Sequence, residues 1–328
     1  MYDRISAGAL NYAPYRLEGS RLLLRGPRPQ TGGAWCAFLG GSETYGRFVP
    51  APYPALVERS LGLPCANFGC QGGGIEVYLK DEALLEACRG ASVTVIAATG
   101  AHALSNRYFK VHPRRNDRFI RASATLKDFY RDVDFSEFHF TRHMLTGLHA
   151  RSAERFARVV AEMQAAWMAR MRTLIGLVGG RVILLWLGED DAAGDPDMSP
   201  PFGPEPLFVT ARMIDELRLM VHEVVICRSP PLLGVERSQG MVMSEIEAPL
   251  ARAGLPVALH RRAADALVGP LRRLFMAGWH DSLAGSRPSA RSAPRPEGGV
   301  STQAPACRGK ASLVLPYDNL SLRQDNIM

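Results

Sequence analysis

Short apolar runs recur along the chain, and each is bounded by residues that favour turns. Their length and their β-branched or aromatic content are typical of buried strands. Between these runs, apolar residues recur every three or four positions, which indicates amphipathic helices. Strands are predicted at residues 35–40, 64–69, 92–99, 181–188 and 223–227. Helices are predicted at residues 52–62, 75–88, 154–178, 212–220, 243–252 and 260–277.

The alternation of strands and helices predicts an α/β fold. A parallel sheet covered by helices on both faces is the economical solution for such a pattern. We therefore expect a three-layer sandwich with a five-stranded, doubly wound parallel sheet in the flavodoxin-like order 2-1-3-4-5. In such folds, the site lies beyond the carboxyl ends of the strands. Ser42, Gly69 and Gly100 each follow a predicted strand and should meet there.

Composition divides the chain into three parts. Residues 1–34 are rich in turn residues and form an N-terminal extension. Residues 35–280 form the α/β domain, with an irregular, charged insertion at about 101–151. Residues 281–328 are dominated by Ser, Pro, Ala, Gly and Arg. A segment with so few large apolar side chains cannot offset its ordering entropy, so a disordered C-terminal tail is predicted.

The overall composition narrows the class of protein. Hydrophobic residues make up 47% of the chain, but no apolar stretch approaches the length of a membrane helix. The six cysteines are scattered without metal-ligand spacing, which predicts reduced thiols and no metal site. With no signal-peptide pattern at the N-terminus, we expect a cytoplasmic protein without membrane attachment.

The chain has a net charge of +7 and a pI near 9.3. Its basic groups are not interleaved with aromatic residues, so a nucleic-acid partner is not expected. The glycine run 72–74 lacks the Lys and Ser/Thr of a phosphate-binding loop and the spacing of a dinucleotide fingerprint, and no cofactor is predicted. Its simpler interpretation is a closely packed turn. The expected partner is therefore a small molecule.

Ser42 is the first candidate for chemistry. It lies between glycines at the end of the first strand, in the stretch Gly40-Gly41-Ser42-Glu43-Thr44-Tyr45-Gly46. A serine in this place can expose its hydroxyl near inward-facing backbone amides. The alternative is a hydroxyl that only caps a helix or satisfies a turn.

Several blocks in order resemble the SGNH (GDSL-type) hydrolase superfamily. The stretch around Ser42 is similar to the family's first block, with Gly41 at the place of its aspartate. Asn67-Phe68-Gly69-Cys70-Gln71-Gly72 matches the second block, N-x-G-x-x-G. His102 stands where the third block has asparagine, and His260 opens the final helix as in the last block. Val257 replaces the usual aspartate there. The chain also resembles an uncharacterised bacterial family of unknown function.

The resemblance implies a catalytic role for four residues. Ser42 would attack an ester, His260 would act as its general base, and the Gly69 N–H with His102 would stabilise the oxyanion. Asn67 belongs to the second block, and Asn106 is an alternative to His102 as a donor, so both are candidate substrate-binding residues. The missing acid leaves His260 open to a second interpretation, as an ordinary residue at the start of a helix.

A cationic cluster in the insertion suggests the kind of ligand. Arg114, Arg115 and Arg118 could hold a carboxylate, sulfate or phosphate, or could be neutralised by nearby acids as a structural network. The first hypothesis is therefore a hydrolase or acyl-transfer enzyme acting on an ester of a small anionic or carbohydrate-like substrate. The alternative is a catalytically inactive protein that binds an anionic glycan or metabolite through the arginine cluster.

Overall fold

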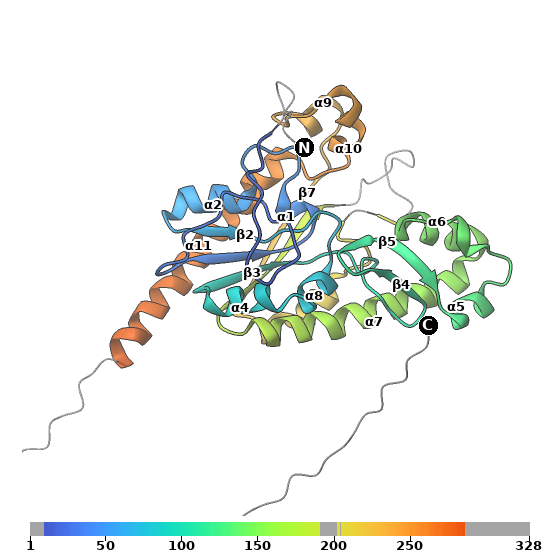
Figure 1. Ribbon diagram of the computed structural model, residues 1–328, viewed down its shortest axis with the longest axis horizontal. Coiled ribbons are helices and arrows are strands. Elements are labelled where there is room, and N and C mark those ends of the chain that lie inside the picture. Colours follow the sequence, from blue (N-terminus) through green and yellow to red (C-terminus); the bar gives the residue numbers. More distant parts are fainter. Residues whose placement is uncertain (1–9, 191–201, 204, 286–328) are drawn as a thin grey trace, which may run out of the picture. The chain divides into compact units, whose positions relative to one another are not determined.

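A five-stranded sheet forms the centre of the computed structural model (Figure 1). The structure describes residues 10–190, 202–203 and 205–285. The strands lie in the order β2-β1-β3-β6-β7, and all neighbouring pairs are parallel. Their bounds are β1 Cys36–Leu39, β2 Cys65–Asn67, β3 Val93–Ala97, β6 Val182–Glu189 and β7 Glu223–Ser229. The predicted fold class and strand order are confirmed.

Burial on both faces explains the apolar runs of the sequence. Every residue of β1 and β3 is buried. Within β1, Ala37 and Leu39 belong to one core cluster, and Cys36 and Phe38 belong to the other. This division follows the two-residue period of a strand, whose side chains alternate between the two faces of the sheet.

Helices cover both faces of the sheet. On one face, α2 contributes Tyr53 and Val57, and α11 contributes Leu267 and Leu271. The other face is covered mainly by α3, α4, α7 and α8. The bounds of these helices are α2 Tyr53–Leu61, α3 Ile75–Leu79, α4 Glu82–Gly90, α7 Ala153–Val178, α8 Ala211–Leu217 and α11 Val257–Gly285. Ser152 caps α7, because its hydroxyl accepts a hydrogen bond from the Arg155 N–H at 3.2 Å.

The single helix predicted at residues 75–88 is two helices, α3 and α4. The reason is Asp81, whose carboxylate accepts a hydrogen bond from the Leu84 N–H at 3.1 Å and caps α4. A side chain that satisfies one of the free N–H groups at a helix start favours a new beginning over continuation.

The insertion contains regular structure that its charge pattern hides. An antiparallel hairpin pairs β4 (Phe109–His112) with β5 (Arg115–Ala122). Charged side chains occupy exposed positions of β5, while Asn116, Phe119 and Ala122 are buried. The hairpin is followed by α5 (Ala124–Phe129), η1 (Phe135–Glu137) and α6 (Thr141–Arg151).

The N-terminal segment packs on the α/β core. Tyr15 and Leu24 form a backbone bridge, and the side chains of Leu22 and Leu24 are buried in the same cluster as Leu39. Met1–Gly285 therefore forms one compact unit. Residues 286–328, which contain most of the predicted disordered tail, lie outside the described residues.

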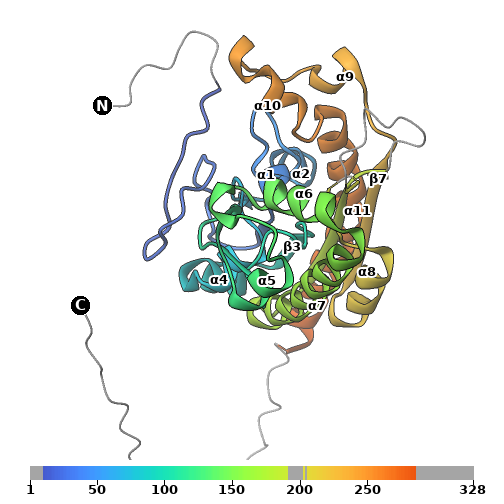
Figure 2. The same cartoon turned by 90° about the vertical axis from the view of Figure 1, so that its right-hand side faces the viewer.

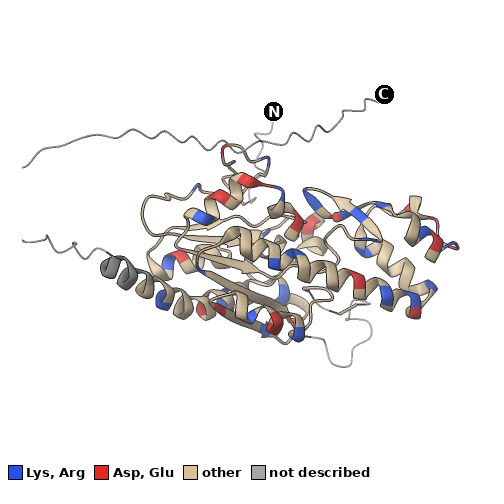
Figure 3. Cartoon of the chain, turned by 90° about the horizontal axis from the view of Figure 1, so that it is seen from below, with Lys and Arg blue, Asp and Glu red and all other residues tan. Residues whose placement is uncertain are grey.

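A second excursion leaves the sheet after β7. It contains α9 (Gly234–Ser238), η3 (Glu245–Glu247) and α10 (Ala248–Arg252), and it ends where α11 begins. The short turn η2 (Arg218–Met220) lies earlier, between α8 and β7. Figure 2 shows the end of the sheet where α1 (Ser42–Tyr45), α6 and α10 come together. Acidic and basic residues are interspersed along the helices drawn in Figure 3. Across the described residues, no helix has the length and apolarity needed to span a membrane.

Candidate active site

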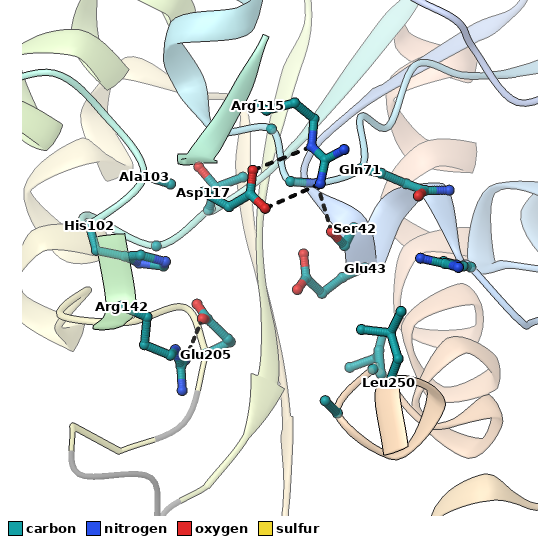
Figure 4. Close-up of a pocket in the computed structure, with 18 of the residues that line it drawn as sticks. Ser42, Glu43, Gln71, His102, Ala103, Arg115, Asp117, Arg142, Glu205 and Leu250 are labelled. Carbon is teal, nitrogen blue, oxygen red and sulfur yellow. Dashed lines mark hydrogen bonds and ion pairs between the residues drawn. The ribbon is translucent and has the colours of Figure 1, made fainter. Parts of the chain in front are cut away.

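A cavity of about 470 Å³ opens at the carboxyl ends of the strands (Figure 4). Its walls come from the loops that follow β1, β2 and β3, from the insertion, and from the excursion before α11. This is the place that the doubly wound order predicts, because the chain connections around β1 diverge there. The polar and charged lining residues include Ser42, Glu43, Arg47, Gln71, Thr99, His102, Arg115, Asp117, Thr141, Arg142, Glu205 and His260.

Ser42 is exposed and begins α1 directly after β1. Its Oγ accepts a hydrogen bond from the Gly72 N–H at 3.0 Å. The turn is held from below by the fully buried Tyr78, whose hydroxyl accepts from the Gly40 N–H and donates to a main-chain carbonyl. Ser42 therefore presents a positioned hydroxyl to the cavity.

Arg25 fixes the other end of the Ser42 segment. This buried guanidinium donates hydrogen bonds to the main-chain carbonyls of Tyr45, Gly46, Val49 and Pro50. It thereby satisfies carbonyl groups at the end of α1 that have no partner within the helix. The N-terminal segment thus helps to place the candidate nucleophile.

Gly72 supplies the backbone amide that faces Ser42. Its φ is +63°, in the left-handed region that favours glycine. A Cβ atom on Gly72 would lie 2.5 Å from the Asp117 carboxylate and 2.9 Å from the Arg115 guanidinium, which form an ion pair. The sequence analysis did not select Gly72, although it is the last glycine of the same N-x-G-x-x-G block.

Gly69 and Asn67 serve the turn rather than line the cavity. The Gly69 N–H donates to Asn67 Oδ1 at 2.9 Å, and Asn67 Nδ2 donates to the Thr44 carbonyl at 2.9 Å. The predicted oxyanion donor on Gly69 is thus occupied within the protein. Neither residue lines the cavity.

His260 lines the cavity from the first turn of α11 and is fully buried. Its Nδ1 accepts a hydrogen bond from the Tyr53 N–H at 3.2 Å, so the neutral ring carries its proton on Nε2. Burial, with a smaller contribution from the Arg25 charge, lowers the pKa of His260 to about 3. The ring is therefore placed as a neutral donor to the cavity, whereas the predicted base requires an acceptor.

His102 lies on the opposite wall, near Glu205 and Arg142. A Cβ atom on Gly100 would lie 2.5 Å from His102 Nδ1 and 2.9 Å from Glu205 Oε2, so both groups face the same point. Burial lowers the pKa of His102, which keeps its ring neutral. Burial would raise the pKa of Glu205, but the Arg142 guanidinium, 2.7 Å away, and the Leu207 N–H, which donates to its carboxylate at 2.9 Å, hold it below the ordinary value.

Glu43 lines the cavity, has a strongly raised pKa and was not predicted from the sequence. Burial of its carboxyl, reinforced by the Glu205 carboxylate, raises the pKa of Glu43 to about 7. A carboxyl group that titrates near neutral pH inside a cavity is a candidate acid or base. Its only sequence signal is its place beside Ser42 in the first block.

Three buried polar atoms at the cavity wall have no hydrogen-bond partner among the described residues. They are Thr99 Oγ1, His102 Nδ1 and His260 Nε2. Buried polar groups in proteins are nearly always paired, and exceptions commonly mark a site where water or a ligand completes the hydrogen bonds. The cavity is thus prepared for a polar ligand.

The predicted substrate-binding arginines separate in the structure. Arg115 lines the cavity, paired with Asp117, whereas Arg118 lies over the Phe140 ring and Arg114 is exposed; neither lines the cavity. Asn106 accepts hydrogen bonds from the Tyr108 and Phe109 N–H groups and organises the start of the hairpin. The two arginines that join Arg115 at the cavity, Arg47 and Arg142, come from outside the predicted cluster.

Each arginine of the cavity has an acidic partner. Arg47 pairs with Glu247 at 3.2 Å, Arg115 with Asp117 at 3.3 Å, and Arg142 with Glu205 at 2.7 Å. In the part of the chain that the structure describes, no group of three or more His, Cys, Asp or Glu side chains is arranged to hold a metal ion. The groups available for chemistry are hydroxyl, carboxyl, imidazole, guanidinium and backbone amide.

Comparison with known proteins gives a family and two similar solved structures. The family model described as "Domain of unknown function (DUF6473)" matches residues 1–275. Among curated proteins, none matches the chain. An acetylxylan esterase, Axe2 from Geobacillus stearothermophilus, is 15% identical over 74% of this chain and 94% of its own, with a TM-score of 0.36. A lipase from a goat rumen metagenome, Lip_vut3, is 12% identical over 72% of this chain and 96% of its own, with a TM-score of 0.35.

Proposed function

The chain belongs to the family of domains of unknown function DUF6473, and we propose that its cavity is the active site of a serine-dependent hydrolase or acyl-transfer enzyme. The observation that carries the proposal is the exposed Ser42 hydroxyl, which the Gly72 N–H contacts at 3.0 Å at the mouth of a polar cavity. A hydroxyl fixed beside a backbone amide is the starting geometry for acyl transfer.

The Gly72 N–H would stabilise the oxyanion of the tetrahedral intermediate. The Ser42 N–H is a second donor, because the first N–H groups of α1 have no partner within the helix. One donor of this kind contributes about 3 kcal/mol to lowering the barrier. We assign this role to Gly72 rather than Gly69, whose amide is bound to Asn67.

The rest of the wall supports the proposed substrate class. His260 Nε2–H, His102 and Thr99 offer hydrogen bonds to a polar substrate, and the three ion pairs offer further donors and acceptors in a fixed arrangement. The substrate is an ester of a small carbohydrate-like or anionic molecule. Its polar groups would complete the hydrogen bonds that the protein leaves open.

Binding without turnover is the alternative, and His260 favours it. An imidazole whose Nδ1 already accepts a backbone N–H and whose pKa is about 3 does not remove a proton from Ser42 at neutral pH. In this alternative, the cavity binds the same polar ligand through its arginine–carboxylate pairs, and Ser42 only contacts it.

Covalent labelling separates the two functions. We expect a fluorophosphonate to label the native protein and not the Ser42→Ala variant, with the labelled peptide containing Ser42. Hydrolysis of p-nitrophenyl acetate should fall by at least about 100-fold in the same variant. Equal labelling of both proteins, or none in either, would favour binding without turnover.

A further inference from the structure

The proposed nucleophile needs a group that removes its proton, and the geometry of His260 leaves that role open. We propose that the Glu43 carboxylate is the general base of Ser42. The inference rests on the proposed function, because it requires that Ser42 react with a substrate. It assigns a catalytic role to a residue of the first block to which the hydrolase resemblance gives none.

The position of the carboxyl group supports this role. The Glu43 side chain folds back toward Gly41, at the start of α1. Its Oε2 lies 2.7 Å from the point that a Cβ atom would occupy on Gly41. In Figure 4, the carboxyl group and the Ser42 side chain both face the cavity that the two residues line.

Gly41 leaves room for this conformation. A Cβ atom at position 41 would lie 2.7 Å from Oε2 of Glu43, so a side chain there would make the carboxyl group shift. The aspartate of the family's first block would stand at this position, and the chain has Gly41 with Glu43 two residues later. The acidic residue of this segment therefore follows Ser42 instead of preceding it, and it lines the cavity.

The hydrogen bonds around Ser42 leave its proton available. Because the Gly72 N–H donates to Oγ, that bond uses a lone pair of the hydroxyl and leaves the O–H free to donate. Among the ion pairs of the described residues, Glu43 takes part in none. Its carboxylate therefore has lone pairs to offer.

The neighbouring charges determine the pH at which the Glu43 carboxylate accepts a proton. Glu205 faces it as an anion fixed by Arg142, and the Arg115–Asp117 pair and the neutral His102 complete the surroundings. The pKa of about 7 means that Glu43 is ionised in a large fraction of molecules near neutral pH and is still basic enough to take a proton.

The proton movements balance over the two steps. As Ser42 Oγ attacks the ester carbonyl carbon, its proton passes to Glu43, and the leaving alcohol takes that proton when the C–O bond breaks. Water then attacks the acyl-enzyme and gives one proton to Glu43. When the acyl bond to Oγ breaks, Glu43 returns the proton to Ser42 and the carboxylic acid departs.

The test is the rate at which a fluorophosphonate labels Ser42 as a function of pH. In the native protein, the second-order rate constant should rise with pH to a plateau, with a midpoint near pH 7. Glu43→Gln should lower the plateau by about 100-fold or more and remove the midpoint. Glu43→Asp should retain part of the pH dependence. The matched control Glu154→Gln, at an exposed glutamate of α7, should label as the native protein does.

The possible outcomes are distinct. If Glu43→Gln labels as fast as the native protein with the same midpoint, the inference is overturned while the proposed function stands. If His260→Asn loses labelling and Glu43→Gln keeps it, His260 is the base. If the native protein labels no better than Ser42→Ala, the proposed function fails and this inference fails with it. A melting temperature of Glu43→Gln at pH 8 equal to or above the native value shows that a slower rate does not reflect misfolding.

Discussion

Thr99, His102 and His260 each bury a polar atom that the described protein leaves without a hydrogen bond. Such an atom lowers the free energy of unfolding by about 1–3 kcal/mol. Three of them at one cavity wall therefore destabilise the fold substantially, which favours a role in binding. Arg25, by contrast, is a buried polar group that is well paired, because its guanidinium donates hydrogen bonds to four carbonyl groups. In the described residues, three further unpaired atoms of this kind lie away from the cavity, on Tyr15, Tyr130 and Trp186, so the cavity wall holds half of them.

His260 should make the protein sensitive to acid. Its pKa is about 3 in the folded protein and near 6.5 when unfolded, so only the unfolded chain takes up this proton between those values. The stability from neutral His260 is complete at pH 7, and about 3 kcal/mol of it is lost by pH 4. In His260→Asn, whose Oδ1 can accept the Tyr53 N–H, the free energy of unfolding should fall less over this range. Urea unfolding at pH 7, 5.5 and 4 measures the difference. Parallel pH dependence in the two proteins would contradict the role assigned to burial.

Ser42, His102, His260 and Arg115 lie at the cavity wall, but the sequence could not show how their polar atoms are used. The tautomer of His260 depends on a backbone N–H more than two hundred positions away, on Tyr53. The perturbed carboxyl of Glu43 depends on Glu205, which approaches through a loop that has no periodic pattern. Such contacts arise from tertiary packing and leave no local signal in the chain.

At the scale of the element, α1 is too short to be stable by itself, since a helix of four residues forms little internal hydrogen bonding. It is held by contacts from other elements: Tyr78 at its start and Arg25 at its end. The β4–β5 hairpin was also not predicted from the sequence, because of its charge pattern. Its exposed face carries arginines, so the alternation of apolar and polar residues resembles a charged loop.

Replacing Arg25 should destabilise the protein and displace the nucleophile together. In Arg25→Met, buried carbonyl groups of residues 45–50 lose their donor, and we expect a loss of about 3 kcal/mol or more. Labelling of Ser42 should slow by at least about 10-fold, because a shift of the turn by an ångström weakens catalysis strongly. Chemical unfolding and labelling rates measure both effects.

Arg89→Met, which removes partly exposed ion pairs, is the control and should change stability by less than about 1 kcal/mol. Similar values for the two variants would show that Arg25 does not hold the turn.

At the scale of the whole molecule, the strand order was the most predictable feature. Buried parallel strands read as continuous apolar runs, and the right-handed crossover between parallel strands restricts the order in which they pair. The order in turn places the loops after β1 and β3 beside one another, so the location of the cavity was also predictable. The role of the N-terminal segment was not, because its turn-rich composition conceals two buried leucines, Leu22 and Leu24.

Removal of residues 1–33 should therefore abolish cooperative folding. The deletion takes away Leu22 and Leu24, worth about 1.5–3 kcal/mol each, and the hydrogen bonds of Arg25. Domains of ordinary stability have about 5–15 kcal/mol in total, so this loss is most of the margin. Thermal unfolding followed by circular dichroism should show no sharp transition in the truncated protein. A melting temperature within a few degrees of the native value would mean that the segment is an independent appendage.

The contact between Gly41 and the Glu43 carboxyl has a consequence for the history of this family. A side chain at position 41 would displace the folded-back carboxyl group of Glu43, because the two would lie only 2.7 Å apart. Relatives that regain an acid at the first position should have lost the second, and the reverse. The two sites would then change as a pair, and lineages would sort into two groups according to which of them carries the negative charge.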